Sequence, residues 1–373
     1  MKNLELKKYV VTPERTVREL MEVIGKNARG IALVTNSKNE FSTTLTDGDV
    51  RRGLLDSVKM EDPISKLVLN KQSRGAHKPV VVSPDMSDDE CLLRMEQSSI
   101  RQLPVVDERG CIVDLVFRDE LLGKTALRLS YITEEITDEV TVDAVDAYGV
   151  IMAGGFGTRL KPLTDHLPKP MLPINGRPLL EHIVERFERA GIRKLFVSTY
   201  FKREVIENHF KKGDEFNVQI DYLHEDEPIG TAGALGLIEV VDKPLVMTNG
   251  DILTKVGLSA LLDFHNDHEA ILTVGVRQYD INVPFGVMNT DGPTVISVDE
   301  KPIFDFLVNA GVYVVSKQAH AMIPQGERYD MTDLIEDILK AGGSVVAFPI
   351  VEYWLDIGQM SDYQQAQEDH GTR

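Results

Sequence analysis

The sequence has few of the residues that would place it outside the cell or in a membrane. It contains two cysteines, Cys91 and Cys111, without CxxC spacing, and we interpret them as small core residues in a reducing compartment. No run of 18 apolar residues occurs, so no transmembrane helix is predicted. The opening segment, MKNLELKKYVVTPERT, lacks the apolar stretch of a signal peptide. These absences predict a cytoplasmic protein without a membrane partner.

Basic residues are also scarce, because 41 Lys and Arg stand against 59 Asp and Glu, giving a net charge of −18. Nonspecific nucleic-acid binding needs a basic face that displaces counterions, so no nucleic-acid partner is expected. An anionic small-molecule substrate remains compatible with this charge if local Lys and Arg, together with metal ions, offset its phosphates. A length of 373 residues predicts two or three domains.

The first third of the chain contains an internal repeat. The segment that begins at Thr12 matches the one that begins at Ser83, with an offset of 70 or 71 residues. Each copy has apolar residues at helical spacing, then a β-rich run (IALVT or LPVVD), a second strand, and an acidic residue that opens a helix. Two β-α-β copies that cannot each close a core predict an intramolecular pair, which we place at residues 1–62 and 63–128.

This pair resembles tandem CBS (cystathionine β-synthase) domains, which commonly bind nucleotides in the cleft between repeats. Thr46 and Asp49 of the segment TDGDVRR carry the resemblance. It implies a regulatory site where the Thr46 hydroxyl meets a phosphate and Asp49 accepts hydrogen bonds from ribose hydroxyls. The second copy keeps its acid, Asp119, but has Val116 in place of the threonine. The alternatives are that Asp49 only caps the following helix and that the pair is a dimerisation scaffold.

An acidic linker, residues 129–146, precedes a region where strands alternate with helices. The predicted strands include YGVIM, KLFVS, VQIDYL, PLVMT and VVAFPI, and the predicted helices include REVIENHF, AGALGLIEVV and DLIEDILKAG. This alternation predicts an α/β domain over residues 147–373, with a Rossmann-like, mixed, mainly parallel sheet covered on both faces. The N-terminal repeats are predicted to be α+β. Ligands in such sheets bind at the carboxyl ends of the strands.

One predicted helix of this region has a simple core-facing stripe. Leu258, Leu261, Leu262 and His265 have the spacing of the buried face of a helix. His265 and His268 share a face but have no third ligand in a recognisable pattern, so no zinc site is predicted there.

A glycine-rich loop directly follows the strand YGVIM. The loop, AGGFGTRLKPLT, occupies residues 153–164. Gly154, Gly155 and Gly157 permit conformations and close approaches that a Cβ would block, and their N–H groups can surround a phosphate. Arg159 adds mobile positive charge from the same loop. The pattern therefore predicts a phosphate-binding site.

Together with the segment PKPMLPI, this loop strongly resembles the sugar-1-phosphate nucleotidyltransferases, a group that includes mannose-1-phosphate guanylyltransferase. The resemblance implies in-line attack of a sugar-phosphate oxygen on the α-phosphorus of an NTP, with release of pyrophosphate. It spans residues 147–373, because further family motifs recur in the family's order: GTAGAL (230–235), NGD (249–251), PFGV (284–287), EKP (300–302), NAGVYV (309–314) and WLDIG (354–358).

The resemblance assigns a role to each charged motif residue. Asp251 and Asp356 would hold Mg²⁺ on the α-phosphate, although either could instead be a helix cap or turn residue, and the number of metal ions stays open. Arg159 would grip the β- and γ-phosphates through its planar fork. Lys169 would neutralise the transferred phosphoryl group, and Lys301 would hold the sugar phosphate.

Further residues would contact the two substrates. Those expected at the nucleotide are Ala153, Gly154, Gly155, Gly157, Thr158, Gly230, Thr231 and Gly250. Those expected at the sugar are Gly286, Glu300, Asn309 and Gly311. Asn309 could instead be an ordinary residue at the end of a strand.

The segment MAGGFGTRL is most similar to the guanylyltransferase branch, and CBS repeats ahead of a transferase resemble a bacterial subgroup that uses GTP and glucosamine-1-phosphate. The resemblance therefore implies GTP with glucosamine-1-phosphate or mannose-1-phosphate. The alternatives are an enzyme that uses UTP, dTTP or CTP, and an inactive protein that only senses nucleotides. A homo-oligomer, either a dimer or a larger assembly, is also expected.

Overall fold

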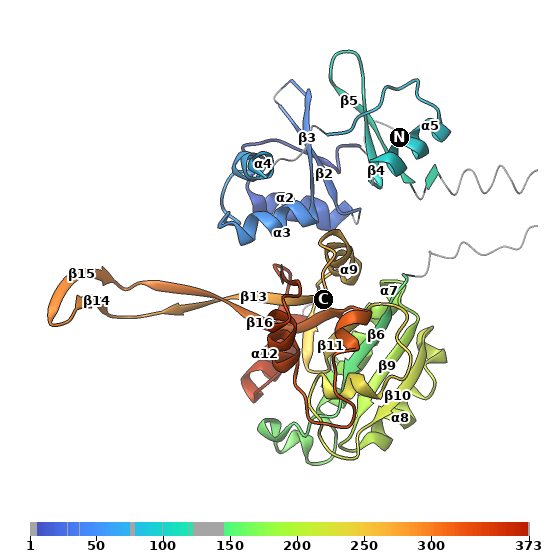
Figure 1. The fold of residues 1–373 in the computed structure, drawn as a ribbon, viewed down its shortest axis with the longest axis vertical. Coiled ribbons are helices and arrows are strands. Elements are labelled where there is room, and N and C mark those ends of the chain that lie inside the picture. The colour runs from blue at the N-terminus through green and yellow to red at the C-terminus, as the bar shows by residue number, and fades with distance from the viewer. Residues whose placement is uncertain are drawn as a thin grey trace, which may run out of the picture. The chain divides into compact units, whose positions relative to one another are not determined.

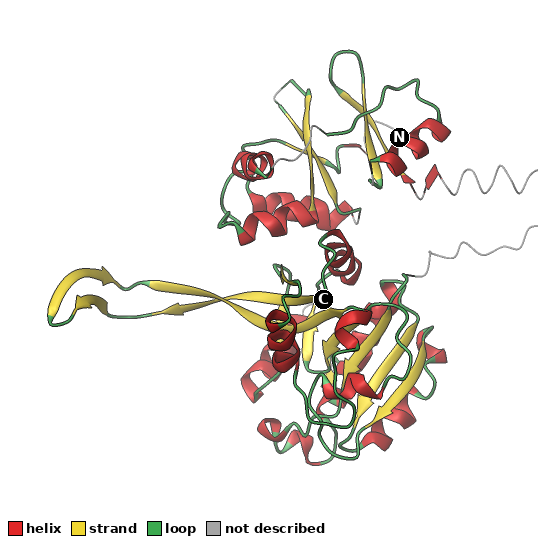
Figure 2. Ribbon diagram, viewed as in Figure 1, coloured by secondary structure: helices red, strands yellow, loops and turns green. Residues whose placement is uncertain are grey.

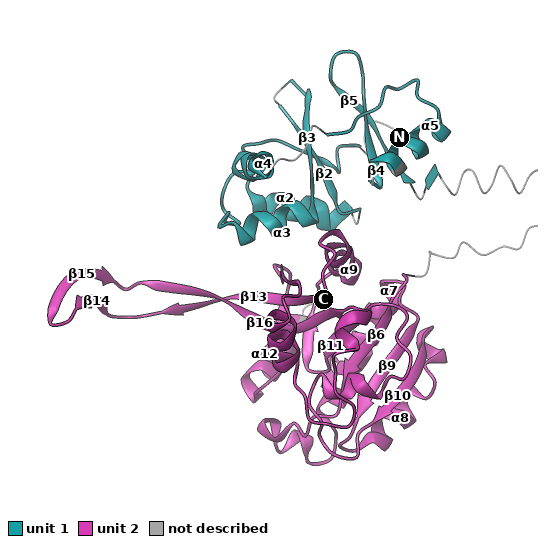
Figure 3. Ribbon diagram, in the orientation of Figure 1, with its two compact units in different colours: residues 1–140 teal, residues 141–373 magenta. Residues whose placement is uncertain are grey.

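The computed structural model describes residues 6–27, 29–36, 38–74, 79–98, 100–118, 120–121 and 145–371. The chain divides into two compact units, residues 1–140 and 141–373 (Figure 3). Both units contain helices and strands (Figure 2). None of the helices within the described ranges is long and apolar enough to cross a membrane. Most of the predicted acidic linker, residues 129–144, lies outside the described residues.

The first repeat of unit 1 forms a small sheet packed against helices. In the sheet, β1 (Val10–Val11) pairs in parallel with β2 (Ile31–Thr35), which pairs antiparallel with β3 (Phe41–Thr46). The helices are α2 (Val17–Asn27), α3 (Asp47–Leu55) and α4 (Ile64–Ser73), the last of which lies beyond residue 62, where the sequence placed the end of this repeat. Their apolar stripes form one core with β2, which includes Val17, Leu20, Ile24, Val34, Ile64 and Leu67.

The second repeat has its own core and shares another with the first. It contains α5 (Asp88–Gln97) and the antiparallel pair of β4 (Gln102–Val106) and β5 (Ile112–Phe117). A further cluster joins Ile31 and Leu33 of the first repeat to residues of β5, which confirms the predicted intramolecular pair.

Both cysteines are free thiols: Cys91 is buried, which raises its pKa, and Cys111 is half-buried.

The sheet of unit 2 has seven strands in the order β10–β9–β6–β11–β16–β13–β17. Neighbours are parallel except where β16 lies antiparallel between β11 and β13, so the predicted mixed, mainly parallel sheet is confirmed. The strands are β6 (Tyr148–Met152), β9 (Lys194–Thr199), β10 (Gln219–His224), β11 (Leu245–Asn249), β13 (Leu272–Asn282), β16 (Ile303–Val315) and β17 (Val345–Pro349).

Helices cover both faces of this sheet, as the alternating pattern predicted. One core contains side chains of α7 (Leu179–Arg189), α8 (Arg203–Phe210) and α9 (Leu258–Asp267). The other contains side chains of α10 (Lys317–His320) and α11 (Met331–Lys340).

The predicted helix AGALGLIEVV is wrong over most of its length. Only a short 3-10 helix, η5 (Gly233–Leu237), forms there. A Cβ on Gly233 would lie 2.9 Å from the carbonyl oxygen of Glu327, so this segment packs backbone against backbone, and its glycines serve close approach rather than helix formation.

A third, smaller core lies beneath the loops at the carboxyl ends of β6 and β11. It joins Leu160 and Leu172 of the glycine-rich region to Leu253 and Ile357. The elements here are η1 (Thr158–Leu160), η2 (Leu163–Asp165), η3 (Lys169–Met171), β7 (Pro173–Ile174), β8 (Arg177–Pro178), β12 (Ile252–Thr254), β18 (Trp354–Asp356) and α12 (Met360–Gly371).

Strands β13 and β16 extend beyond the sheet as a paired ribbon. It is followed by the antiparallel pair of β14 (Gly286–Asp291) and β15 (Thr294–Glu300). In Figure 1 this ribbon projects away from the other elements of unit 2, with β14 and β15 at its far end.

Candidate active site

The glycine-rich loop leaves the sheet at the carboxyl end of β6, beside the end of β11. The two strands run parallel and pair Met152 with Asn249, so the loops that follow them begin at the same edge. The Ala153 N–H donates to Ser198 of β9 at 3.0 Å, and the Gly250 N–H donates to Met152 at 2.9 Å. The Gly-rich and NGD motifs therefore meet, as the rule for ligand sites in such sheets requires.

Gly157 has a definite structural reason to be glycine, whereas Gly155 does not. Gly157 has φ 62°, and a Cβ there would lie 2.9 Å from Thr164 and 3.0 Å from Lys169. The Thr164 hydroxyl donates to the Gly157 carbonyl at 2.9 Å, which fixes this turn. Around Gly155, by contrast, a Cβ would meet no heavy atom within 4 Å. Its open side is where a phosphate could approach the backbone.

Lys169 and Asp251 form the closest charged contact of the site. The Lys169 Nζ lies 2.6 Å from the Asp251 Oδ2. Lys169 belongs to η3, between Pro168 and Pro170, and is buried although it is charged. The Asp251 Oδ1 is buried without a hydrogen-bond partner in the structure. Because a buried carboxylate oxygen is stable only with a donor or cation, this atom indicates a position for a ligand.

Asp356 joins this pair through a two-stranded sheet. Strand β12 follows Asp251 directly and pairs antiparallel with β18, with Ile252 opposite Asp356. The Ile357 N–H also donates to the Asp251 carbonyl at 3.0 Å. Burial and the negative charge of Asp251 raise the pKa of the Asp356 carboxyl, while the positive charges of Lys169 and Arg159 oppose that rise.

Arg159 lies on η1 at the same place. Its Nη1 and the Asp356 Oδ1 are each 3.7 Å from the point where a Cβ on Gly358 would stand. The side chain is exposed, so its guanidinium has the freedom to bind a ligand. The structure thus brings together Arg159, Lys169, Asp251 and Asp356 from three separate parts of the sequence.

The donor set fits a magnesium ion. Mg²⁺ prefers one or two carboxylates and completes its shell with phosphate oxygens and water. Here burial and the negative charge of Asp251 raise the pKa of Asp356, and the Asp251 Oδ1 is buried without a partner. Within the described residues, no group of three or more His, Cys, Asp or Glu side chains could hold a metal. The arrangement therefore suits a metal shared with phosphate and does not suit a closed structural site.

Glu225 is a residue that sequence reasoning missed. It is buried, accepts a hydrogen bond from the Ser198 hydroxyl, and accepts another from the Ile229 N–H at 3.2 Å. A Cβ on Gly154 would lie 2.9 Å from its Oε1. Glu225 thus packs against the backbone of the glycine-rich loop at Gly154. The signal in the sequence was an acidic residue directly after a strand, in HEDEPIG, but the many neighbouring acids obscured it.

Gly230 and Thr231 lie where GTAGAL meets the start of α11. Gly230 has φ 85°, and a Cβ there would lie 2.6 Å from the Asp330 Oδ1. The Thr231 N–H donates to the same oxygen at 3.2 Å, and its hydroxyl accepts from the Met331 N–H at 3.1 Å. These contacts define a structural role for both residues, and their contact with a nucleotide stays a prediction.

The expected sugar-binding residues fall into two separate groups. Asn309 and Gly311 lie within β16 inside the sheet, where the Gly311 N–H donates to the Asn309 Oδ1 at 3.0 Å. A Cβ on Gly311, which has φ 68°, would lie 2.8 Å from the Asn249 amide nitrogen. Gly286 and Glu300 pair with each other on the projecting ribbon, and Lys301 follows them there. The structure does not bring this second group to Asp251.

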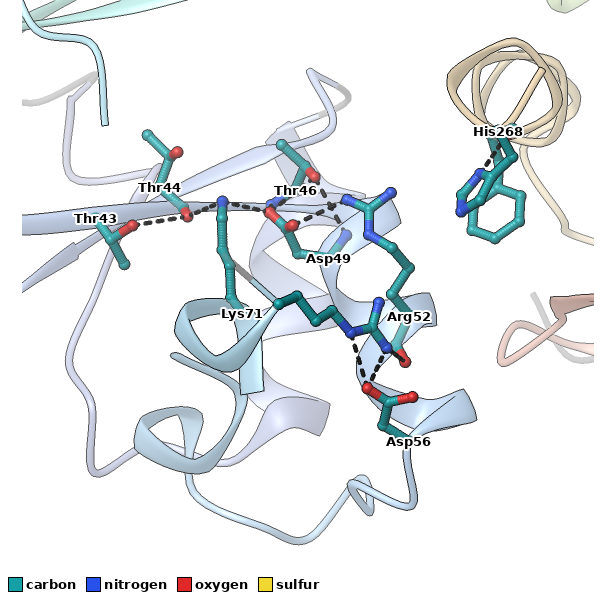
Figure 4. A network of polar contacts seen from close by, with 10 residues as sticks. Thr43, Thr44, Thr46, Asp49, Arg52, Asp56, Lys71 and His268 are labelled. Carbon is teal, nitrogen blue, oxygen red and sulfur yellow. Dashed lines mark hydrogen bonds and ion pairs between the residues drawn. The ribbon is translucent and has the colours of Figure 1, made fainter. Parts of the chain in front are cut away.

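In unit 1, the TDGD segment forms a helix cap with buried charges. The Thr46 hydroxyl accepts from the Asp49 N–H at 3.3 Å, and the Asp49 carboxylate accepts from the Thr46 N–H at 3.0 Å. Arg52 and Lys71 donate to Asp49 at 2.9 and 2.8 Å, as Figure 4 shows. Burial tends to raise the pKa of Asp49, but the contacts with Lys71, Thr46 and Arg52 hold it below the ordinary value.

The capping alternative for Asp49 is therefore present in the structure. A ribose could reach this carboxylate only by displacing a partner or by sharing its free lone pairs. The expected second acid, Asp119, lies outside the described residues.

Residues 148–373 match the nucleotidyl transferase family, and residues 76–125 match the CBS domain. The chain belongs to the nucleotidyl transferase family. Nucleotidyl transferases of this family generally use a divalent metal, which agrees with the paired carboxylates described above.

Relatives with differing specificities share this region. A mannose-1-phosphate guanylyltransferase of Mycobacterium tuberculosis is 34% identical over 233 residues, which cover 60% of this chain and 64% of the relative. A UTP–glucose-1-phosphate uridylyltransferase of Synechocystis is 30% identical over 238 residues, covering 58% and 61%. The chain thus spans less than two thirds of the length of these relatives.

The fold also resembles solved structures. A Bacillus anthracis chain, described as a candidate glucose-1-phosphate thymidylyltransferase in complex with sucrose, superposes with a TM-score of 0.50 and 24% identity. The match covers 61% of this chain and 96% of that one. The nucleotidyltransferase fold of unit 2 is thereby shown.

Proposed function

We propose that this chain is a Mg²⁺-dependent sugar-1-phosphate nucleotidyltransferase, which makes an NDP-sugar and pyrophosphate from an NTP and a sugar-1-phosphate. The main support is the convergence of Lys169, Asp251, Asp356 and Arg159 at one edge of the sheet. Two cationic side chains and two carboxylates beside a glycine-rich loop suit a reaction between two phosphates.

The proposed reaction is a single in-line displacement. A sugar-phosphate oxygen attacks the α-phosphorus, a new P–O bond forms, and the bond to the β-phosphate oxygen breaks with its electrons retained by pyrophosphate. Lys169 lies in a position to neutralise the transferred phosphoryl group. Arg159 suits the β- and γ-phosphates, because its fork can bind two oxygens at once. No covalent intermediate with the protein is needed.

The metal would be held by Asp251 and Asp356. When bound, Mg²⁺ supplies neutralisation of phosphate charge and polarises the α-phosphate. The Asp251 Oδ1, which is buried and has no partner in the structure, is the atom best placed for it. Lys169 holds the opposite oxygen, Oδ2, in place, because its ammonium lies 2.6 Å away.

We favour GTP as the nucleotide, with glucosamine-1-phosphate or mannose-1-phosphate as the sugar. The guanylyltransferase relative at 34% identity supports GTP, and the uridylyltransferase relative at 30% identity keeps UTP as the second candidate. The N-terminal repeats would bind a regulatory nucleotide or hold a homo-oligomer together. We expect the protein to work in the cytoplasm.

A panel assay of pyrophosphate release tests the proposal. Purified full-length protein is incubated with Mg²⁺, each of four NTPs and several sugar-1-phosphates, with EDTA and Asp251→Asn as controls. We expect release that requires both substrates and is fastest with GTP. Silence across the panel from a folded protein would favour the nucleotide-sensing alternative. Release without any sugar phosphate would indicate hydrolysis and would contradict the transfer reaction.

A further inference from the structure

The ribbon formed by β13 and β16 beyond the sheet is unusually exposed. We call residues 277–308 the arm. Its ladder is continuous from Arg277 to Asn282 along β13 and resumes in β14 and β15. In the described part of unit 2, pairing of β13 with β17 ends at Val276, and pairing of β16 with β11 begins at Val312. Among the described strands, therefore, none pairs with the arm as a third strand.

One face of the arm is apolar and uncovered. Tyr279 lies opposite Phe306, and Ile281 lies opposite Phe304. These side chains are 44–58% exposed. The run IFDFLV, which begins at Ile303, also resembles the near-continuous hydrophobic pattern of a strand buried on both faces. More exposed apolar side chains follow along the arm: Phe285, Met288, Val295, Ile296, Val298 and Leu307.

Such a surface is typical of an interface. An isolated two-stranded ribbon is at best marginally stable in water, and a large exposed apolar patch marks a site of association. In addition, Asp280 lies directly opposite Asp305, a pairing of like charges that destabilises the ribbon further. The arm therefore needs a partner surface.

The arm also carries Glu300 and Lys301, to which the family resemblance assigns contacts with the sugar and its phosphate. Glu300 and Lys301 lie beyond Ile303, and the strand from Ile303 back to Asn309 covers about 20 Å at ~3.3 Å per residue. Figure 1 shows the far end of the arm standing away from the sheet. The pairs Asn282–Ile303 and Gly286–Glu300 flank Lys301 on the two sides of the break in the ladder, so Lys301 lies on the arm, next to the β14–β15 pair that stands away from the sheet.

Lys301 has a left-handed backbone conformation next to the β14–β15 pair. Its φ is 49°, in the left-handed region that non-glycine residues rarely adopt, and the next residue is Pro302. The Pro302 carbonyl accepts from the Val283 N–H at 3.1 Å, which holds this turn in place.

We propose that the arm of one copy lies across the charged cluster of a second copy, where its Glu300 and Lys301 complete the sugar-phosphate half of that site. Reciprocal exchange about a two-fold axis gives two complete sites and a closed dimer. The arm of the second copy has the same uncovered apolar face, so the apolar faces of the two arms can be buried together in the dimer. The proposal rests on the proposed function, because it uses the role assigned there to the charged cluster, together with the sugar-phosphate role that the family resemblance implies for Lys301.

Mixed dimers of two inactive variants test the exchange. Lys301→Ala and Asp251→Asn chains carry different affinity tags, are co-expressed, and are purified through both tags. In an exchanged dimer, one site contains the intact arm and the intact cluster, so we expect about half of the wild-type rate of pyrophosphate release. Each variant purified alone through the same steps should have about 1% or less of that rate.

The possible results separate the two proposals. If the arm serves its own chain, no site in the mixed dimer is intact, and an inactive mixed dimer would overturn the exchange. A fully active Lys301→Ala variant would also overturn it, because the arm would then contribute nothing to the reaction. If the wild-type protein itself releases no pyrophosphate across the substrate panel, the proposed function fails first, independently of the mixed dimers.

Discussion

The Lys169 ammonium lies 2.6 Å from the Asp251 carboxylate, although 82 residues separate them in the chain. In the absence of a ligand, each charge compensates the other at a largely buried position. If a phosphate and a metal bind, each residue exchanges its present partner for a stronger one. The phosphate replaces Asp251 as the anionic partner of Lys169, and the metal replaces Lys169 as the cationic partner of Asp251. We expect the contact to hold the two charges in the geometry that the proposed reaction needs.

Asp251→Asn should abolish most of the activity without unfolding the protein. The amide has nearly the same shape but cannot supply the negative charge that a metal needs, so we expect turnover to fall by about a hundredfold or more. Asp242→Asn is a matched control, because Asp242 is a surface acid bonded to Tyr148. Steady-state rates at saturating Mg²⁺ provide the measurement. Near-normal turnover of Asp251→Asn would exclude the metal assignment.

Arg159→Ala should reduce the rate more than Arg159→Lys, and neither variant should reach the wild-type rate. A lysine retains the positive charge beside Asp356 but cannot reproduce the two-pronged binding of a guanidinium. Rates should be compared at saturating NTP, so that binding and turnover are separated. Equal rates for the two variants would show that the guanidinium geometry has no role.

Two neighbouring glycines should respond differently to the same substitution. In Gly157→Ala, the positive φ and the contacts with Thr164 and Lys169 predict a loss of about 1–3 kcal/mol in the free energy of unfolding. Gly155→Ala should leave that free energy unchanged, because its Cβ meets nothing. If NTP phosphates approach the loop there, the KM for NTP should nevertheless rise. Denaturant titrations and kinetics of both variants test this, and an unchanged KM for Gly155→Ala would argue against phosphate contact at that position.

The sequence predicted the sheet well, because its strands follow apolar patterns that are local to a few residues. The apolar runs that alternate with helical patterns identified β6, β9, β10 and β11, and Asp251 could be placed at the carboxyl edge of β11. Asp356, within β18, was assigned to the site through the family resemblance alone. Their meeting depends on the pairing of β12 with β18. No local pattern encodes that pairing, and only the family resemblance predicted it.

Other features escaped prediction for physical reasons. The pattern around Gly233 has the apolar content of a helix, but close backbone contact with residue Glu327 overrides it. Glu225 acts through burial beneath Gly154, a tertiary property that composition cannot show. The motifs around Gly286 and Lys301 could be recognised, but the sequence does not reveal that their ribbon leaves the sheet. Strand patterns indicate burial and do not specify which chain provides the cover.

The stability of unit 2 should depend on the protonation of His265. This side chain, on the predicted core stripe of α9, is buried with its Nδ1 2.8 Å from the Thr273 hydroxyl, and burial lowers its pKa from 6.5 to about 4. Between pH 6.5 and 4, His265 therefore binds a proton in the unfolded chain but not in the folded chain, and the free energy of unfolding falls as the pH drops through this range. We expect a loss of roughly 2 kcal/mol between pH 7 and 4.5. Urea titrations of wild type and His265→Gln should show this excess loss in the wild type only.

The last prediction concerns regulation through Asp49. If a nucleotide that binds beside Thr46 regulates the enzyme, it must bind two states of the enzyme with different affinities. A coupling free energy of about 1–3 kcal/mol would change the substrate affinity of the transferase about five- to 150-fold. Asp49→Asn keeps the size of the side chain but removes the charge that holds Arg52 and Lys71, so the response to added adenine or guanine nucleotide should disappear while the basal rate remains. Asp56→Asn is the matched control, because Asp56 belongs to the same network through Arg74 but is more exposed. Rates measured at saturating NTP but subsaturating sugar-1-phosphate keep the effector from competing at the nucleotide site and still reveal a change in substrate affinity, and circular dichroism checks that the variant folds. If no nucleotide changes the rate of the wild type, the repeats act as a scaffold, because a regulator without differential affinity cannot shift an equilibrium.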